Sequence, residues 1–295
     1  MSDHAGQLKA LPKRKDFFVG IDSDGCAFDT MEIKHKECFI PNIINSWGLQ
    51  AVSRFAREAA EFVNLYSQWR GINRFPALVM VFDLLADWDQ PLARGYKAPR
   101  VDSLRRWLGE ETRLGNPALE AKVKEGRDPV LARALEWSKA VNESVAKMVR
   151  NVPPFPYVRE SLKRLESKTD IMVVSATPGE ALEREWQEHD IAQYARMICG
   201  QEMGSKKEHL QHGAKGKYEA ERILMVGDAP GDMKAAKAND ALFFPINPGD
   251  ESASWQRFCE EGIDRFLAGR YRGDYEKGLI EAFMACLPST PPWKK

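Results

Sequence analysis

Four short apolar runs, each followed by polar residues, constrain the fold of this chain more than any other feature of its sequence. The runs FFVGI, IMVV, ILMV and ALFF lie at residues 17–21, 171–174, 223–226 and 241–244, with a weaker run at 196–199. Near-continuous apolarity over so few residues indicates strands that are covered on both faces, as in a parallel sheet. Helix-like segments separate the later runs, which predicts an α/β fold with a doubly wound, Rossmann-like parallel sheet.

The strand pattern breaks off after the first run and resumes near residue 155. The intervening residues are helical in pattern, because apolar side chains recur at helical spacing. Asn116 and Asp128, each followed by proline, are expected to be helix N-caps. The proline-rich segment at 151–156 would return the chain to the sheet. The interruption therefore indicates an inserted all-helical domain.

These patterns predict two domains. Residues 1–30 and 155–295 would form the α/β catalytic core, and residues 31–154 would form a helical cap inserted after the first strand. Two further helical stretches, at 255–268 and 274–287, are expected to pack outside the core.

Composition and charge exclude several classes of partner. Lys plus Arg and Asp plus Glu each total 43, so there is no net positive charge to attract nucleic acid or an anionic membrane. The most apolar stretch, residues 75–85, is too short to span a bilayer. Five scattered cysteines indicate neither a disulfide framework nor a zinc ribbon. We expect a cytoplasmic protein with no nucleic-acid or membrane partner.

Polar side chains follow three of the predicted strands. Asp22 and Asp24 come after the first run, Ser175 after the second, and Asp228 and Asp232 after ILMV. The carboxyl ends of parallel strands meet at one edge of a sheet, where ligands bind. These side chains are therefore expected to converge.

Convergence of carboxylates creates repulsion that a cation would relieve. Two carboxylates about 4 Å apart repel by about 4 kcal/mol at an effective dielectric constant near 20. Mg²⁺ accepts a few carboxylate oxygens and keeps its other positions for water and a substrate phosphate. The sequence therefore predicts Mg²⁺ near Asp22, Asp24, Asp228 and Asp232.

Four motifs in this order resemble the haloacid dehalogenase superfamily of phosphohydrolases and phosphotransferases, in the arrangement with a helical cap inserted after the first strand. They are DSDGCAFD at 22–29, VVSATP at 173–178, GSKKEHL at 204–210 and VGDAPGD at 226–232. The resemblance covers the alternating core, about half of the chain. Cys26 departs from it, because the family commonly has threonine or valine there, and the insert is long for such a cap.

The resemblance implies a covalent mechanism. Asp22 would be the nucleophile that forms an aspartyl-phosphate, and Asp24 would be the general acid and base. The family's Mg²⁺ would be held by the carboxylates of Asp22 and Asp228 and by the backbone carbonyl of Asp24.

The same resemblance implies which groups contact the phosphate. Ser175 and Ala176 would bind it, and a lysine would supply positive charge in the transition state. We assign that lysine to Lys206, while Lys207 remains an alternative. Asp232 would act through a water molecule or on Lys206.

The predicted function is a Mg²⁺-dependent phosphatase that acts on a small phosphorylated metabolite. Alternatives are a phosphomutase or another phosphotransferase, a dehalogenase, and a non-catalytic phosphate-ligand-binding protein. In the insert, the polar segment at 67–75 makes Arg70, Asn73 and Arg74 candidates for contacting the substrate, although an ordinary solvated loop explains them as well.

Overall fold

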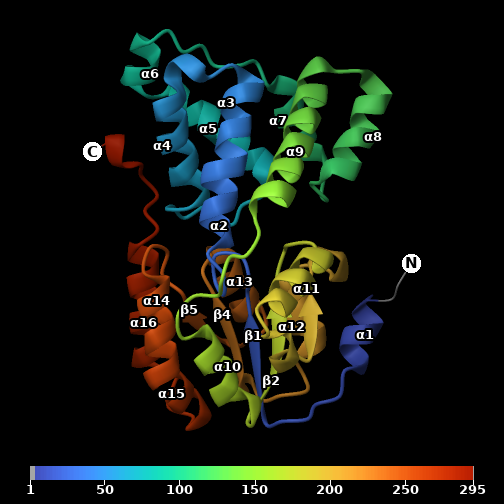
Figure 1. Ribbon diagram of the computed structural model, residues 1–295, viewed down its shortest axis with the longest axis vertical. Helices are drawn as coiled ribbons and strands as arrows, with labels where there is room; N and C mark the ends of the chain where they lie inside the picture. The colour runs from blue at the N-terminus through green and yellow to red at the C-terminus, as the bar shows by residue number, and fades with distance from the viewer. Residues whose placement is uncertain (1–3, 295) are drawn as a thin grey trace. The chain divides into compact units, whose positions relative to one another are not determined.

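The computed structural model of the protein describes residues 4–294, which form two compact units (Figure 1). The first unit comprises residues 4–30 and 151–286, and the second comprises residues 31–150 and 287–294. The sequence-based division placed residues 151–154 with the cap and residues from 287 onward with the core, so the two divisions differ there. Residues 1–3 and 295 lie outside the described residues.

The first unit is built on one parallel sheet of five strands in the order β3-β2-β1-β4-β5. Each predicted run is a strand, including the weak one, so the doubly wound α/β prediction is confirmed. The strands are β1 (Phe17–Ile21), β2 (Thr169–Val174), β3 (Met197–Cys199), β4 (Ile223–Gly227) and β5 (Leu242–Pro245). All of β2, β4 and β5 is buried, as strands covered on both faces must be.

Helices surround this sheet (Figure 1). They are α1 (His4–Ala10), α10 (Val158–Glu166), α11 (Gly179–Glu188), α12 (Lys206–Gly213), α13 (Pro230–Ala238), α14 (Glu251–Arg257), α15 (Ile263–Leu267) and α16 (Asp274–Ala285), with a π-helical turn η6 (Phe258–Gly262) and the short 3₁₀ turns η3 (Ala192–Tyr194), η4 (Gln201–Met203) and η5 (Ala220–Arg222). The expectation that the helices after residue 250 lie outside the core is wrong. Trp255, Phe258 and Phe266 are fully buried in the same cluster as the apolar side chains of β1 and β4.

The second unit is helical. It contains α2 (Thr30–Ile33), the π-helical η1 (Lys34–Phe39), α3 (Ile40–Trp47), η2 (Gln50–Val52), α4 (Ser53–Asn64), α5 (Arg74–Ala86), α6 (Asp89–Ala93), α7 (Asp102–Glu110), α8 (Asn116–Gly126), α9 (Pro129–Met148) and η7 (Pro292–Lys294). Asp128 is the N-cap of α9, as predicted, and accepts from the backbone N–H groups of Val130 and Leu131. At α8 the N-cap is Gly115, and Asn116 is already helical.

The end of the chain packs into this helical unit. The ring of Trp293 stacks on that of Trp88, with centroids 4.1 Å apart and an interplanar angle of 6°, and it forms a T-shaped pair with the ring of Phe62. Lys294 forms an ion pair with Asp87. These contacts explain why the last residues group with the helical unit, although α16 packs on β5.

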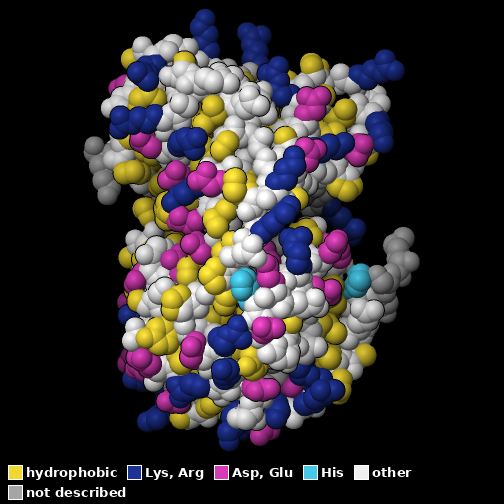
Figure 2. Space-filling model, in the orientation of Figure 1, with side chains coloured by type: hydrophobic (Ala, Val, Ile, Leu, Met, Phe, Trp, Pro, Cys, Tyr) yellow, Lys and Arg dark blue, Asp and Glu magenta, His cyan; other side chains and the backbone are white. Residues whose placement is uncertain are grey.

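The surface carries both signs of charge. Figure 2 shows Lys and Arg as well as Asp and Glu side chains on the visible face. None of the helices between residues 4 and 294 combines the length and the apolar character needed to cross a bilayer.

Candidate active site

Asp22 stands at the carboxyl end of β1, in the middle of the sheet. Its backbone N–H donates to the carbonyl of Val226 at 3.0 Å, so the polypeptide stays tied to β4 past the end of β1. Its Oδ1 accepts from the backbone N–H of Ser23 at 2.7 Å. Gly25 completes the turn at a φ of 80°, a conformation that side chains with a Cβ avoid. Asp22 is 4% exposed, and a charge buried to this degree is costly without a partner.

Asp228 and Asp232 come from the adjacent strand. Asp228 follows β4 directly, and Asp232 lies in the first turn of α13, where its Oδ2 accepts from the backbone N–H of Ala229 at 3.0 Å. A Cβ atom on Gly227 would lie 2.4 Å from the Cβ of Asp232, so only glycine permits this close approach. Both carboxylates are buried.

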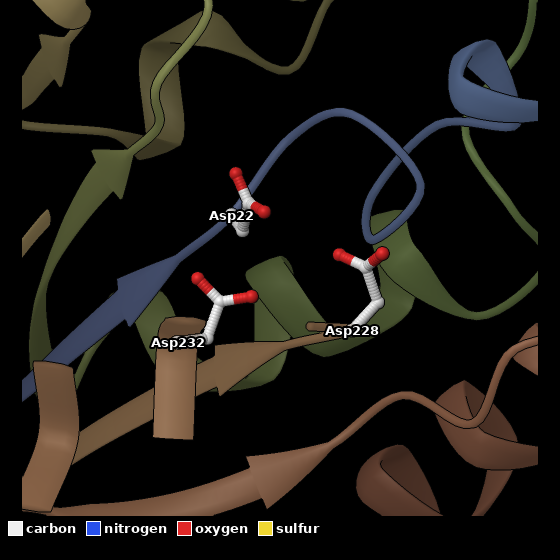
Figure 3. A group of neighbouring side chains, drawn as sticks. All are labelled: Asp22, Asp228 and Asp232. Carbon is white, nitrogen blue, oxygen red and sulfur yellow. The ribbon is translucent and has the colours of Figure 1, made fainter. Parts of the chain in front are cut away.

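The three carboxylates converge. Figure 3 shows the side chains of Asp22, Asp228 and Asp232 directed into one space at the ends of β1 and β4. One oxygen from each lies within 4.8 Å of the others. The predicted convergence is therefore present for these three residues, and together they could hold a divalent cation.

Lys206 supplies a positive charge to this group. It is the first residue of α12, and its Nζ lies 2.6 Å from Asp22 Oδ2 and 2.6 Å from Asp232 Oδ1. Burial by itself lowers the pKa of the Lys206 ammonium, but the carboxylates of Asp22, Asp232 and Asp228 outweigh burial and raise it. Lys207, the alternative left open by the sequence, is exposed.

Burial lowers the pKa of a lysine but raises that of a carboxylic acid, and Asp232 shows the second effect. The pKa of Asp232 is raised, first by burial and further by the charge of Asp22, and Lys206 only partly offsets this. Three carboxylates against one ammonium leave an excess of negative charge in a buried place. That excess is the electrostatic reason why a cation fits the space between the side chains.

Ser175 and Asp24 occupy the neighbouring loops. Ser175 follows β2, is 1% exposed, and its Oγ accepts from the backbone N–H of Thr177 at 3.3 Å. The register pairs Ile21 with Val173 of β2 and with Val226 of β4, so the loops that carry Asp22, Ser175 and Asp228 begin side by side. Ala176, next to Ser175, is exposed. The hydroxyl of Thr30 donates to Asp24 Oδ1 at 2.5 Å.

The candidates in the insert have partners within the helical unit. Arg70 is 3% exposed and donates to the carbonyl of Leu65 at 2.9 Å. Asn73 is the N-cap of α5 and also donates to the carbonyl of Leu114. The guanidinium of Arg74 donates to the carbonyl and hydroxyl of Ser138 and to Asn142 Oδ1. These contacts explain all three residues by packing, and their role toward a substrate stays a prediction.

Two features escaped the sequence analysis. Ser205 and Glu208 form a capping box that starts α12 immediately before Lys206, and the pattern Ser-x-x-Glu could have revealed it. The indole N–H of Trp186 donates to Ser23 Oγ at 3.0 Å. No local pattern could have revealed this bond, because the two residues are 163 positions apart.

Comparison with known protein families identifies the same family that the sequence motifs resemble. Residues 95–244, just over half of the chain, match a family model described as haloacid dehalogenase-like hydrolase. The match begins after Asp22, so the first motif lies outside it. No curated protein matches the sequence.

Solved structures of low sequence identity are similar to this chain. A haloacid dehalogenase-like family protein from Streptococcus pneumoniae is 13% identical, with a TM-score of 0.45 over 85% of this chain and 97% of that one. A predicted phosphoglycolate phosphatase from Haemophilus somnus is also 13% identical, with a TM-score of 0.45 over 81% and 89%. A predicted phosphatase from Clostridium acetobutylicum is 12% identical, with a TM-score of 0.44 over 91% and 100%. With the family model matched over half of its length, this chain belongs to the haloacid dehalogenase-like hydrolases.

Proposed function

We propose that this hydrolase is a Mg²⁺-dependent phosphatase that cleaves a small phosphomonoester through an aspartyl-phosphate. The observation that carries the proposal is the group of three buried carboxylates within 4.8 Å of one another, with Lys206 in contact with two of them. A cluster of this kind binds a hard cation and an anion together, which is what transfer of a phosphoryl group requires.

Asp22 is the proposed nucleophile. The backbone N–H of Ser23 holds one carboxylate oxygen, so the direction of the side chain is set before the substrate arrives. A carboxylate oxygen attacks phosphorus as the bond from phosphorus to the ester oxygen breaks, and the phosphoryl group is then carried by Asp22.

Asp24 is the proposed acid and base. In the first step it gives a proton to the departing ester oxygen, which leaves as an alcohol. In the second step it takes a proton from the water molecule that attacks phosphorus, and inorganic phosphate and free Asp22 result. The hydrogen bond from the Thr30 hydroxyl to Asp24 Oδ1 orients this carboxylate.

Lys206 and Ser175 are the proposed phosphate contacts, with the backbone N–H of Ala176 beside them. The ammonium would balance negative charge on the phosphoryl oxygens, and the serine hydroxyl would donate to one of them. Asp22, Asp228 and the backbone carbonyl of Asp24 are the proposed ligands of Mg²⁺, and Asp232 keeps Lys206 in place. When bound, Mg²⁺ supplies positive charge that neutralises the phosphate and orients it.

The test is release of inorganic phosphate from a panel of small phosphomonoesters. We expect release with Mg²⁺, none with EDTA, and a loss of about a thousandfold or more in Asp22→Asn. Asp16→Asn is the matched control, because Asp16 is an exposed carboxylate just before the opposite end of β1. Undiminished turnover in Asp22→Asn would refute the assignment of the nucleophile.

The same panel separates the alternatives. A phosphomutase converts one phosphoester into another and needs a bisphosphate activator, with little free phosphate. A non-catalytic binder takes up phosphate in equilibrium dialysis and shows no turnover with any ester. Release of halide from a 2-haloacid without Mg²⁺ identifies a dehalogenase.

A further inference from the structure

Ser23 separates Asp22 from Asp24 and touches the proposed nucleophile directly. Its backbone N–H donates to Asp22 Oδ1 at 2.7 Å, and the residue is fully buried. Its carbonyl accepts from the backbone N–H groups of the next residues in the loop, Cys26, Ala27 and Phe28, at 3.3, 2.9 and 3.0 Å. A rotation of the Ser23 backbone would therefore move the Asp22 carboxylate and the loop that carries Asp24.

Trp186 holds the side chain of Ser23. Its indole N–H donates to Ser23 Oγ at 3.0 Å, and its ring is fully buried. Its ring and that of Phe28 form a T-shaped pair with centroids 6.0 Å apart, and the carbonyl of Trp186 accepts from the backbone N–H of Ile191. The indole of Trp186 is therefore held by the ring of Phe28, at the end of the same loop, and its backbone is held by a hydrogen bond at the end of α11.

The other side of the loop is fixed in the same way. The indole N–H of Trp255, in α14, donates to the carbonyl of Cys26 at 2.8 Å. Two buried indoles from helices far apart in the sequence thus reach a loop of seven residues, 22–28. Buried polar groups need such partners, but the bond to Ser23 differs from the other because it acts on the residue between the two aspartates.

We propose that Trp186 is a positioning residue for the reaction, acting through Ser23 on the direction of the Asp22 carboxylate. This inference rests on the proposed function, which assigns the attack on phosphorus to Asp22. A displacement of about 1 Å at a reacting group can lower a rate about a hundredfold, so one fixed hydrogen bond beside the nucleophile has a measurable effect on turnover.

Two variants remove the bond from its two ends. Trp186→Phe keeps a buried aromatic ring and loses the donor, and Ser23→Ala loses the acceptor with the removal of one oxygen atom. Trp137→Phe is the matched control, because Trp137 is a buried tryptophan of α9 whose indole nitrogen has no hydrogen-bond partner among the described residues. Circular dichroism checks that each protein is folded.

We expect kcat to fall about tenfold or more in Trp186→Phe and in Ser23→Ala, with KM within about twofold of the wild type. The double variant should be no slower than the slower single variant, because both changes remove one bond. Trp137→Phe should keep its kcat. A kcat within twofold of the wild type in Trp186→Phe, or effects that multiply in the double variant, would overturn the inference.

A second measurement does not depend on turnover. Isothermal titration calorimetry with Mg²⁺ alone measures the affinity of the site for the ion. Because Asp22 is a proposed ligand, this affinity should fall when its carboxylate is no longer held in the right direction. We expect weaker Mg²⁺ binding, by about threefold or more, in Trp186→Phe and Ser23→Ala, and none of this loss in Trp137→Phe. If the wild type releases no phosphate from any ester, the proposed function fails, and the titration alone then tests the positioning role of Trp186. Equal Mg²⁺ affinities in the wild type and in the three single variants would overturn that role.

Discussion

Replacing Lys206 with methionine would test the electrostatics of the site. The substitution keeps the length of the side chain and removes the charge that lies 2.6 Å from both Asp22 and Asp232. At an effective dielectric constant near 20, each of these contacts is worth about 6 kcal/mol, and each pair of carboxylates about 5 Å apart repels by about 3 kcal/mol. Without the ammonium, the three buried acids cannot all stay ionised.

Proton uptake sets how much stability the variant loses. If one of the three acids takes up a proton to relieve the repulsion, the free energy of unfolding falls by the free energy of protonating an ordinary Asp, which is about 5 kcal/mol at pH 7.5 and about 2 kcal/mol at pH 5.5. The folded variant then binds a proton that its unfolded chain does not bind. Its stability therefore falls as pH rises, and the deficit relative to the wild type is largest at pH 7.5.

Urea unfolding at both pH values measures this deficit. Lys207→Met is the matched control, because Lys207 is the exposed neighbour in the same helix, and it should change stability by less than about 0.5 kcal/mol. Adding Mg²⁺ should raise the free energy of unfolding more in Lys206→Met than in the wild type, because the ion substitutes for the missing ammonium charge. Equal stability of the two variants at pH 7.5 would refute the reasoning.

Three further predictions concern other parts of the chain. Gly227→Ala should reduce stability by about 3 kcal/mol or more and weaken Mg²⁺ binding, because its Cβ would meet Asp232 at 2.4 Å; normal unfolding and titration curves would contradict this. Trp293→Ala should lower stability by about 1–2 kcal/mol and speed amide exchange in α6, because the stack on Trp88 is lost, whereas unchanged exchange would show that the stack is unimportant. Burial lowers the pKa of His209 to about 4, so the wild type should lose up to about 3 kcal/mol as pH falls from 6.5 to 4; an NMR titration midpoint near 6.5 would exclude this.

Much of the α/β core was predictable because its signals are local. A strand buried on both faces must be apolar along its whole length, so β1, β2, β4 and β5 are visible as short runs. Parallel pairing then brings the residues after these strands to one edge, which is why the sequence indicated that Asp22 and Asp228 meet.

The errors came where the sequence pattern has more than one explanation. The helices after residue 250 have the same periodicity whether they pack on a core or at its margin, and the burial of Trp255 and Phe266 became visible only with the fold. The polar segment that holds Asn73 and Arg74 also has two explanations. Both side chains form hydrogen bonds within the helical unit, and their role toward a substrate stays a prediction.

The sequence by itself determined the strands, the order of the polar residues that follow them, and the family resemblance, because these depend on neighbours along the chain. Only the tertiary structure showed that Lys206 contacts Asp22 while Lys207 is exposed, that Trp186 donates to Ser23, and that Trp293 groups with the helical unit. The physical reason is that a hydrogen bond, an ion pair or a ring stack depends on the distance between atoms. The partners in these three contacts, Trp186 with Ser23, Lys206 with Asp22 and Trp293 with Trp88, are 163, 184 and 205 positions apart in chain order.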